Sequence, residues 1–60
     1  MKAEIILIIQ HLAHLIHVFQ TDGHYSIVWE HNGSMKGFHT TMSLNKALLS
    51  AERITEQVRS

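Results

Sequence analysis

The sequence contains no cysteine and no proline, and only three of its 60 residues are glycine. Without cysteine, the chain has neither disulfide bonds nor a thiolate metal site. This composition fits a reducing compartment, so we expect a cytoplasmic protein. Without proline, Gly23, Gly33 and Gly37 are the only strong breakers, and they divide the chain into an apolar segment, a hairpin and a last helix.

The sequence also lacks an excess of either charge, because five Lys/Arg balance five Asp/Glu. A neutral chain has no strong electrostatic attraction to phosphate or to an acidic surface. A long apolar run is missing too, since the 19 residues 2–20 include seven polar ones. A membrane-spanning helix needs about 20 nearly continuous apolar residues, so we expect no membrane span.

Sixty residues are enough for one domain, 1–60, and no more. A chain of this size buries only about 60 % of the surface that its unfolded form exposes, which makes it marginally stable alone. Small domains are usually supported by disulfides, a metal or an oligomer interface. With disulfides excluded, self-association or a bound partner is the expected support.

The first of the three segments, residues 3–20, is rich in apolar residues. At about 100° per residue its apolar side chains share one arc, and the polar side chains lie opposite. This pattern predicts an amphipathic helix that ends before Gly23. β-branched residues favour strands, so a shorter helix followed by a strand at 15–20 remains an alternative. The residues expected to form a dimer interface on the helix are Ile5, Ile8, Leu12, Ile16 and Phe19.

Residues 24–31 alternate in polarity, with Tyr25, Ile27 and Trp29 on one face of the expected strand. Asn32-Gly33 is the preferred pair for a two-residue type I′ turn, because both positions need positive φ. The pattern therefore predicts a β-hairpin that reverses at these two residues.

The register of that hairpin follows from the turn, which places Trp29 opposite Lys36 and Ile27 opposite Phe38. Opposed residues share a face of a sheet. We therefore expect Phe38 and Trp29 on the same, inward face.

The last segment has an apolar stripe at helical spacing, and Ser43 is its expected N-cap. Leu49 points away from the stripe. The predicted fold class is α+β, with an N-terminal helix, a two-stranded antiparallel hairpin and a C-terminal helix (α-β-β-α). A lone hairpin is marginally stable and two amphipathic helices need cover, so we expect a homodimer paired through the first helix.

Three histidines at 11, 14 and 17 interrupt the first segment. On a helix, one metal ion could take two of them but not all three, and protonation of the cluster could make it a pH sensor. A solvated polar face is the simpler interpretation, and no cofactor or metal is predicted.

No phosphate-binding loop, H-E-x-x-H motif or carboxylate pair is present, so we expect no enzyme. The favoured function is a small protein-binding regulator or inhibitor that docks on a larger protein. The alternative is a nucleic-acid-binding accessory protein or transcriptional regulator. The candidate partner-binding residues are Met35, His39, Leu49, Glu52, Arg53 and Glu56.

The hairpin followed by S-L-x-x-A-L-x-x-A, over residues 24–58, resembles the layout of very small accessory proteins encoded by phages and plasmids. Such proteins often inhibit or redirect a larger enzyme. The resemblance identifies no single family, and it implies a docking function without assigning residues to it.

Overall fold

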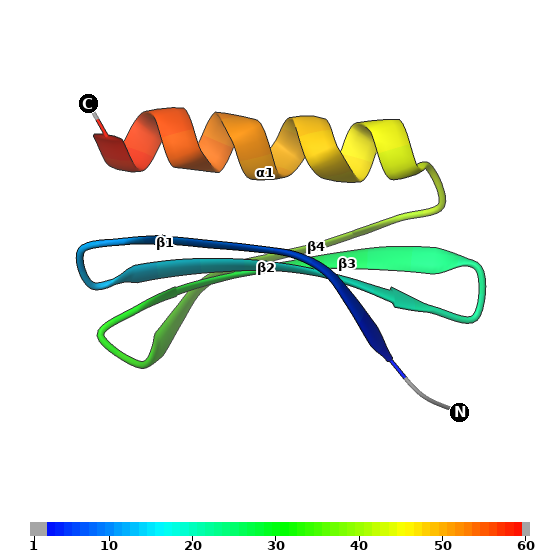
Figure 1. The fold of residues 1–60 in the computed structure, drawn as a ribbon, viewed down its shortest axis with the longest axis horizontal. Helices are drawn as coiled ribbons and strands as arrows, with labels where there is room; N and C mark the ends of the chain where they lie inside the picture. Colours follow the sequence, from blue (N-terminus) through cyan, green and yellow to red (C-terminus); the bar gives the residue numbers. More distant parts are fainter. Residues whose placement is uncertain (1–2, 60) are drawn as a thin grey trace.

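A computed structural model of the protein describes residues 3–59. The chain forms one four-stranded antiparallel sheet followed by a single helix that lies along one face of the sheet (Figure 1). The sheet order is the chain order. The elements are β1 (Glu4–His11), β2 (His14–Thr21), β3 (His24–His31), β4 (Ser34–Thr41) and α1 (Leu44–Arg59).

The predicted α-β-β-α fold is therefore wrong. The segment expected to be a helix forms β1 and β2, joined by a two-residue turn at Leu12-Ala13. Its many β-branched residues favour strands, and each strand gains a partner along its whole length. The expected hairpin is not isolated, because β3 and β4 are half of a larger sheet. The alternative that placed a strand at 15–20 is correct for that stretch, which lies inside β2.

The turns explain why the last hairpin was predictable and the first was not. Asn32 and Gly33 have φ values of 53° and 81°, and Asp22 and Gly23 have 48° and 81°. Positive φ at both positions is the type I′ requirement, so the predicted reversal at Asn32-Gly33 is confirmed. Gly23 sits in a hairpin turn rather than after a helix. In the first turn, Leu12 has φ 55°. Leucine rarely adopts this conformation, so the sequence does not mark a turn there.

The predicted register of the last hairpin is wrong beyond its first pair. His31 opposes Ser34 as expected, but a β-bulge then shifts the pairing, so that Trp29 opposes Gly37 and Val28 opposes Phe38. A bulge adds one residue to one strand and reverses the faces of all that follow. Trp29 and Phe38 therefore lie on opposite faces of the sheet.

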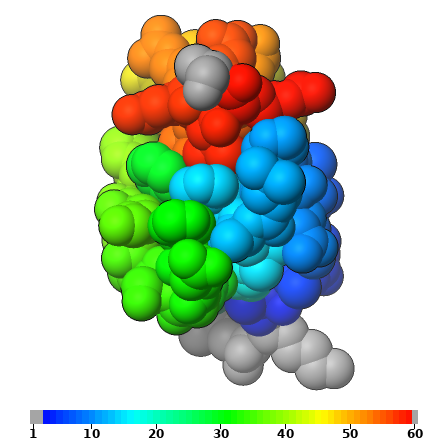
Figure 2. All heavy atoms as spheres, turned by 90° about the vertical axis from the view of Figure 1, so that its left-hand side faces the viewer, coloured from blue at the N-terminus to red at the C-terminus, as the bar shows by residue number. Residues whose placement is uncertain are grey.

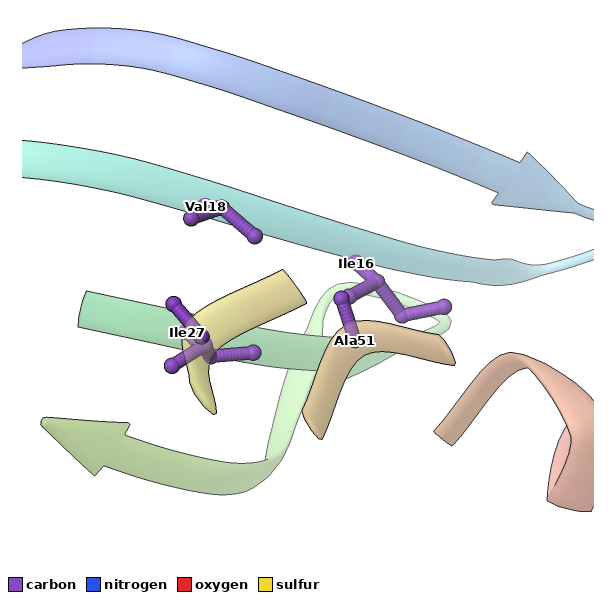
Figure 3. Close-up of a cluster of buried hydrophobic side chains, with 5 residues drawn as sticks. Ile16, Val18, Ile27 and Ala51 are labelled. Carbon is purple, nitrogen blue, oxygen red and sulfur yellow. The ribbon is translucent and has the colours of Figure 1, made fainter. Parts of the chain in front are cut away.

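The core lies between the sheet and α1. Its fully buried residues come from the two central strands and the helix (Figure 3). Leu7, Ile9, Tyr25, Trp29 and Ile54 pack around it. Among residues 3–59, only three large side chains are completely buried, which is a small core even for this length. The buried set is Ile16, Val18, Ile27, Ala47 and Ala51.

The helix begins where its sequence signal placed it. The Lys46 amide donates to Ser43 Oγ over 3.3 Å, which confirms Ser43 as the N-cap. Alanines at the centre of the apolar stripe let α1 approach the sheet closely. Viewed along the strands, α1 (orange to red) lies on one side of the sheet (Figure 2). No second helix among residues 3–59 covers the other side.

Candidate functional site

The sheet face that α1 leaves uncovered, called the open face below, is the candidate functional site. Opposed residues of antiparallel strands share a face, so the pairing places twelve side chains here in three rows that cross β1 to β4, and Thr21 and His24 continue the face at the end of β2 and the start of β3. The rows are Ile5–Phe19–Ser26–Thr40, Ile8–His17–Val28–Phe38 and Gln10–Leu15–Glu30–Met35.

Seven of these twelve side chains are apolar, and they reach from one edge of the sheet to the other. On β1, Ile5 and Ile8 are 57 % and 53 % exposed. On β4, Met35 and Phe38 are 63 % and 62 % exposed. Single exposed apolar residues are ordinary on protein surfaces, but a contiguous apolar face marks a site of interaction.

The charged centre of the open face is one pair of side chains on the two central strands. His17 Nε2 lies 3.2 Å from Glu30 Oε2, and the His17 ring tilts against Phe19 with centroids 5.4 Å apart. Both ring nitrogens of His17 are buried: Nε2 faces the Glu30 carboxylate at this short distance without the geometry of a hydrogen bond, and Nδ1 has no hydrogen-bond partner within residues 3–59. A buried nitrogen without a partner loses its interaction with water uncompensated. No Lys or Arg belongs to the twelve residues of the open face.

A second polar cluster lies on the helix side of the sheet, where cross-strand pairing aligns His11, His14 and His31. The rings of His14 and His31 stack with centroids 4.0 Å apart. Trp29 Nε1 donates to His14 Nδ1 over 3.1 Å. Partial burial, followed by the positive charges of His31, His11 and Lys36, lowers the pKa of His14 below its usual 6.5.

The strand geometry separates the three histidines that the sequence suggested as a group. His11 and His14 point to the helix side, whereas His17 points to the open face, because residues an odd number of positions apart on a strand alternate between faces. The described residues contain no group of three possible metal ligands. They also enclose no detectable pocket.

The residues predicted to bind a partner do not form one surface. Met35 lies on the open face, whereas His39 pairs with Ile27 and lies on the helix side of β4. The other four are exposed on α1: Leu49, Glu52, Arg53 and Glu56.

The predicted dimer residues are better grouped, although the helix that was to carry them does not exist. Ile5, Ile8 and Phe19 gather on the open face. Leu12 sits in the first turn, and Ile16 is buried under α1.

Sequence reasoning missed Leu15 and Phe38 as members of the open face. The alternation of residues 14–21 carried the signal for Leu15, because it matches a strand as well as a helix. The bulge before Phe38 has no such signal.

No family model, curated protein or solved structure matches this chain, so its function must be inferred from its own residues. Among residues 3–59, α1 is too short and too polar to cross a membrane.

Proposed function

We propose that this chain is a small, non-enzymatic protein-binding regulator or inhibitor that docks the open face of its sheet on a larger protein. The observation that carries the proposal is the gathering of seven apolar side chains on the one face that α1 does not cover. Strands of eight residues in a four-stranded sheet give a face of about 19 by 27 Å, or roughly 500 Å². The seven apolar side chains occupy more than half of the row positions on this face, and the largest apolar patch of a small protein often has a binding role.

The chemistry of the face favours a protein over a nucleic acid. Nucleic-acid affinity comes mainly from Lys and Arg contacts to phosphate, and the open face has neither. Its central carboxylate, Glu30, would repel phosphate. The nearest cation, Lys36, is the extra residue of the β4 bulge, and the remaining described cations are on α1. The alternative of a nucleic-acid-binding accessory protein or transcriptional regulator therefore has weaker support.

The cytoplasm is the proposed location. The absence of cysteine supports this location, because a small domain of marginal stability in an oxidising compartment is usually stabilised by disulfides.

The test compares three baits in affinity capture from a native lysate: the unmodified chain, Phe38→Ser and Leu49→Ser. Both side chains are well exposed, at 62 % and 46 %, so neither change should disturb the core. Phe38 probes the open face, and Leu49 probes the outer surface of α1. Circular dichroism of each variant verifies that the fold is kept.

We expect one protein that binds the unmodified chain and Leu49→Ser, fails to bind Phe38→Ser, and behaves identically when it is purified and remixed. Binding that survives Phe38→Ser and is lost with Leu49→Ser would move the site to α1. Salt-sensitive recovery of nucleic acid would support the alternative, and the absence of any remixed complex would refute docking on a larger protein.

A further inference from the structure

We propose that in the free protein a second copy of this chain covers the open face, forming a two-fold dimer with sheet packed on sheet and both helices outside. This inference rests on the proposed function, because it takes the open face to be a protein-docking surface. It adds the regulation of that surface: the dimer must open before a larger protein can bind there.

The available area is sufficient for a self-interface. Two faces of roughly 500 Å² bury about 1,000 Å² in total, which is the lower limit for a specific protein–protein interface. The face is flanked by short two-residue turns at Leu12-Ala13, Asp22-Gly23 and Asn32-Gly33, so no long loop stands between two approaching sheets. Sheets in sandwiches pack about 10 Å apart with strands near −30°.

The charges of the face are complementary to the same face on another copy. A two-fold interface brings each patch against itself, so a patch with a net charge would repel its copy. Here Glu30 lies beside His17, which carries a charge only when protonated, on the central strands β2 and β3. A two-fold axis through the centre of the face places each pair against the other, His17 toward Glu30.

The core also needs the additional burial. One helix covers one face, and three large side chains are fully buried. A chain of this size is marginally stable alone. A second copy would bury a second apolar layer, which includes Ile8, Val28 and Phe38. The core between the sheet and α1 would stay unchanged.

A dimer formed by pairing two β1 edges is the competing arrangement, since β1 is a long, apolar edge strand. That arrangement extends the sheet sideways and leaves Met35 and Phe38, on the far edge, as exposed as in the single chain. Stacking of the open faces covers both edges at once, which is why it is favoured.

The experiment is analytical ultracentrifugation of the purified unmodified chain and of three variants over a wide concentration range. Ile8→Ser and Phe38→Ser change the same row of the open face from opposite edges, on β1 and β4. Leu49→Ser, on the outer surface of α1, is the matched control. Each two-fold dimer loses two copies of the altered side chain, and loss of one interface anchor weakens binding about tenfold, so the dimer should weaken about a hundredfold.

We expect the unmodified chain and Leu49→Ser to reach twice the 6.9 kDa mass of one chain, and both row variants to dissociate. Dissociation by Ile8→Ser with no effect of Phe38→Ser would overturn the inference, because stacked faces bury both ends of this row. A monomer at every concentration for the unmodified chain would overturn it too, and so would equal weakening by Leu49→Ser.

A second measurement guards against variants that merely misfold. The chain has no cysteine, so Val28→Cys introduces a single thiol in the central row of the open face. A short bis-maleimide should link two Val28→Cys chains and should not link two Leu49→Cys chains; the opposite result would refute the stacked dimer. Failure here leaves the capture test untouched, because a monomer can still dock its open face on a larger protein.

Discussion

Leu12 is the most strained residue of the turns, and replacing it with Asn should stabilise the protein. Its φ of 55° is in the left-handed region, where the Cβ atom of an L-residue crowds the following carbonyl. Asn accepts this conformation more readily because its short side chain hydrogen-bonds locally. The two later hairpins already have Asp or Asn at the equivalent position.

The size of the gain follows from two opposing effects. The left-handed conformation costs a branched residue roughly 1–2 kcal/mol, of which Asn recovers a large part. Leu12 is 81 % exposed, so its removal gives up only a small share, about 0.3–0.6 kcal/mol, of the 1.5–3 kcal/mol that full burial of leucine contributes. The net stabilisation of Leu12→Asn is about 0.5–1 kcal/mol, which raises the melting temperature of a domain this small by roughly 2–8 °C.

Thermal and urea unfolding at one fixed chain concentration measure this effect without interference from self-association. Met42→Asn is the control, because Met42 is equally exposed, at 82 %, but is not among the residues with positive φ. Asn32→Leu is the reciprocal variant and should lose about the same free energy. If Leu12→Asn left stability unchanged, or if Met42→Asn raised it equally, backbone strain would not be the cause.

Three further predictions concern the core, the helix and pH. Ile27→Ala should cost about 2–5 kcal/mol because Ile27 is fully buried, and urea unfolding should show it as a lower midpoint. Ser43→Ala should cost about 1 kcal/mol through loss of the N-cap bond to Lys46, whereas Ser43→Asp should keep it. The pKa of His14 is lower in the folded protein than in the unfolded chain, so as the pH falls the unfolded chain takes up this proton first. The free energy of unfolding should therefore be highest above pH 6.5 and should decrease as the pH drops below that value. His14→Gln should flatten this acid loss, and a slope identical to that of the unmodified chain would contradict the role of His14.

The parts of the fold that sequence reasoning predicted correctly are those with a local chemical signal. Asn32-Gly33 demands positive φ, and Ser43 offers an oxygen to the first turn of a helix, so the reversal and the start of α1 were both correct. Residues 3–20 failed because a run dense in apolar residues fits a helical arc and two alternating strands about equally well. The deciding feature was the turn at Leu12-Ala13, whose strain is offset only by the sheet that it closes.

The composition of the open face was only partly predictable for a related reason. Ile5, Ile8 and Phe19 were chosen as interface residues from a helical pattern. Ile5 and Ile8 are three positions apart and share a face only because the pairing shifts at an irregularity between Ile5 and Leu7, and Phe19 joins them by pairing with Ile5. Phe38 was placed on the wrong face because one extra residue at the β4 bulge switches the later side chains of the strand to the opposite face of the sheet. Bulges depend on how neighbouring strands twist and pack, which a single sequence does not display.

The order of the strands also determines how the chain reaches this fold. Every strand pairs only with its neighbour along the chain, and even the widest pair in the middle hairpin, His14 with His31, spans 17 residues. Short separations keep the entropy of loop closure low, so the sheet can grow hairpin by hairpin, each turn bringing its own strands together. With no proline anywhere in the chain, refolding has no peptide-bond isomerisation to await.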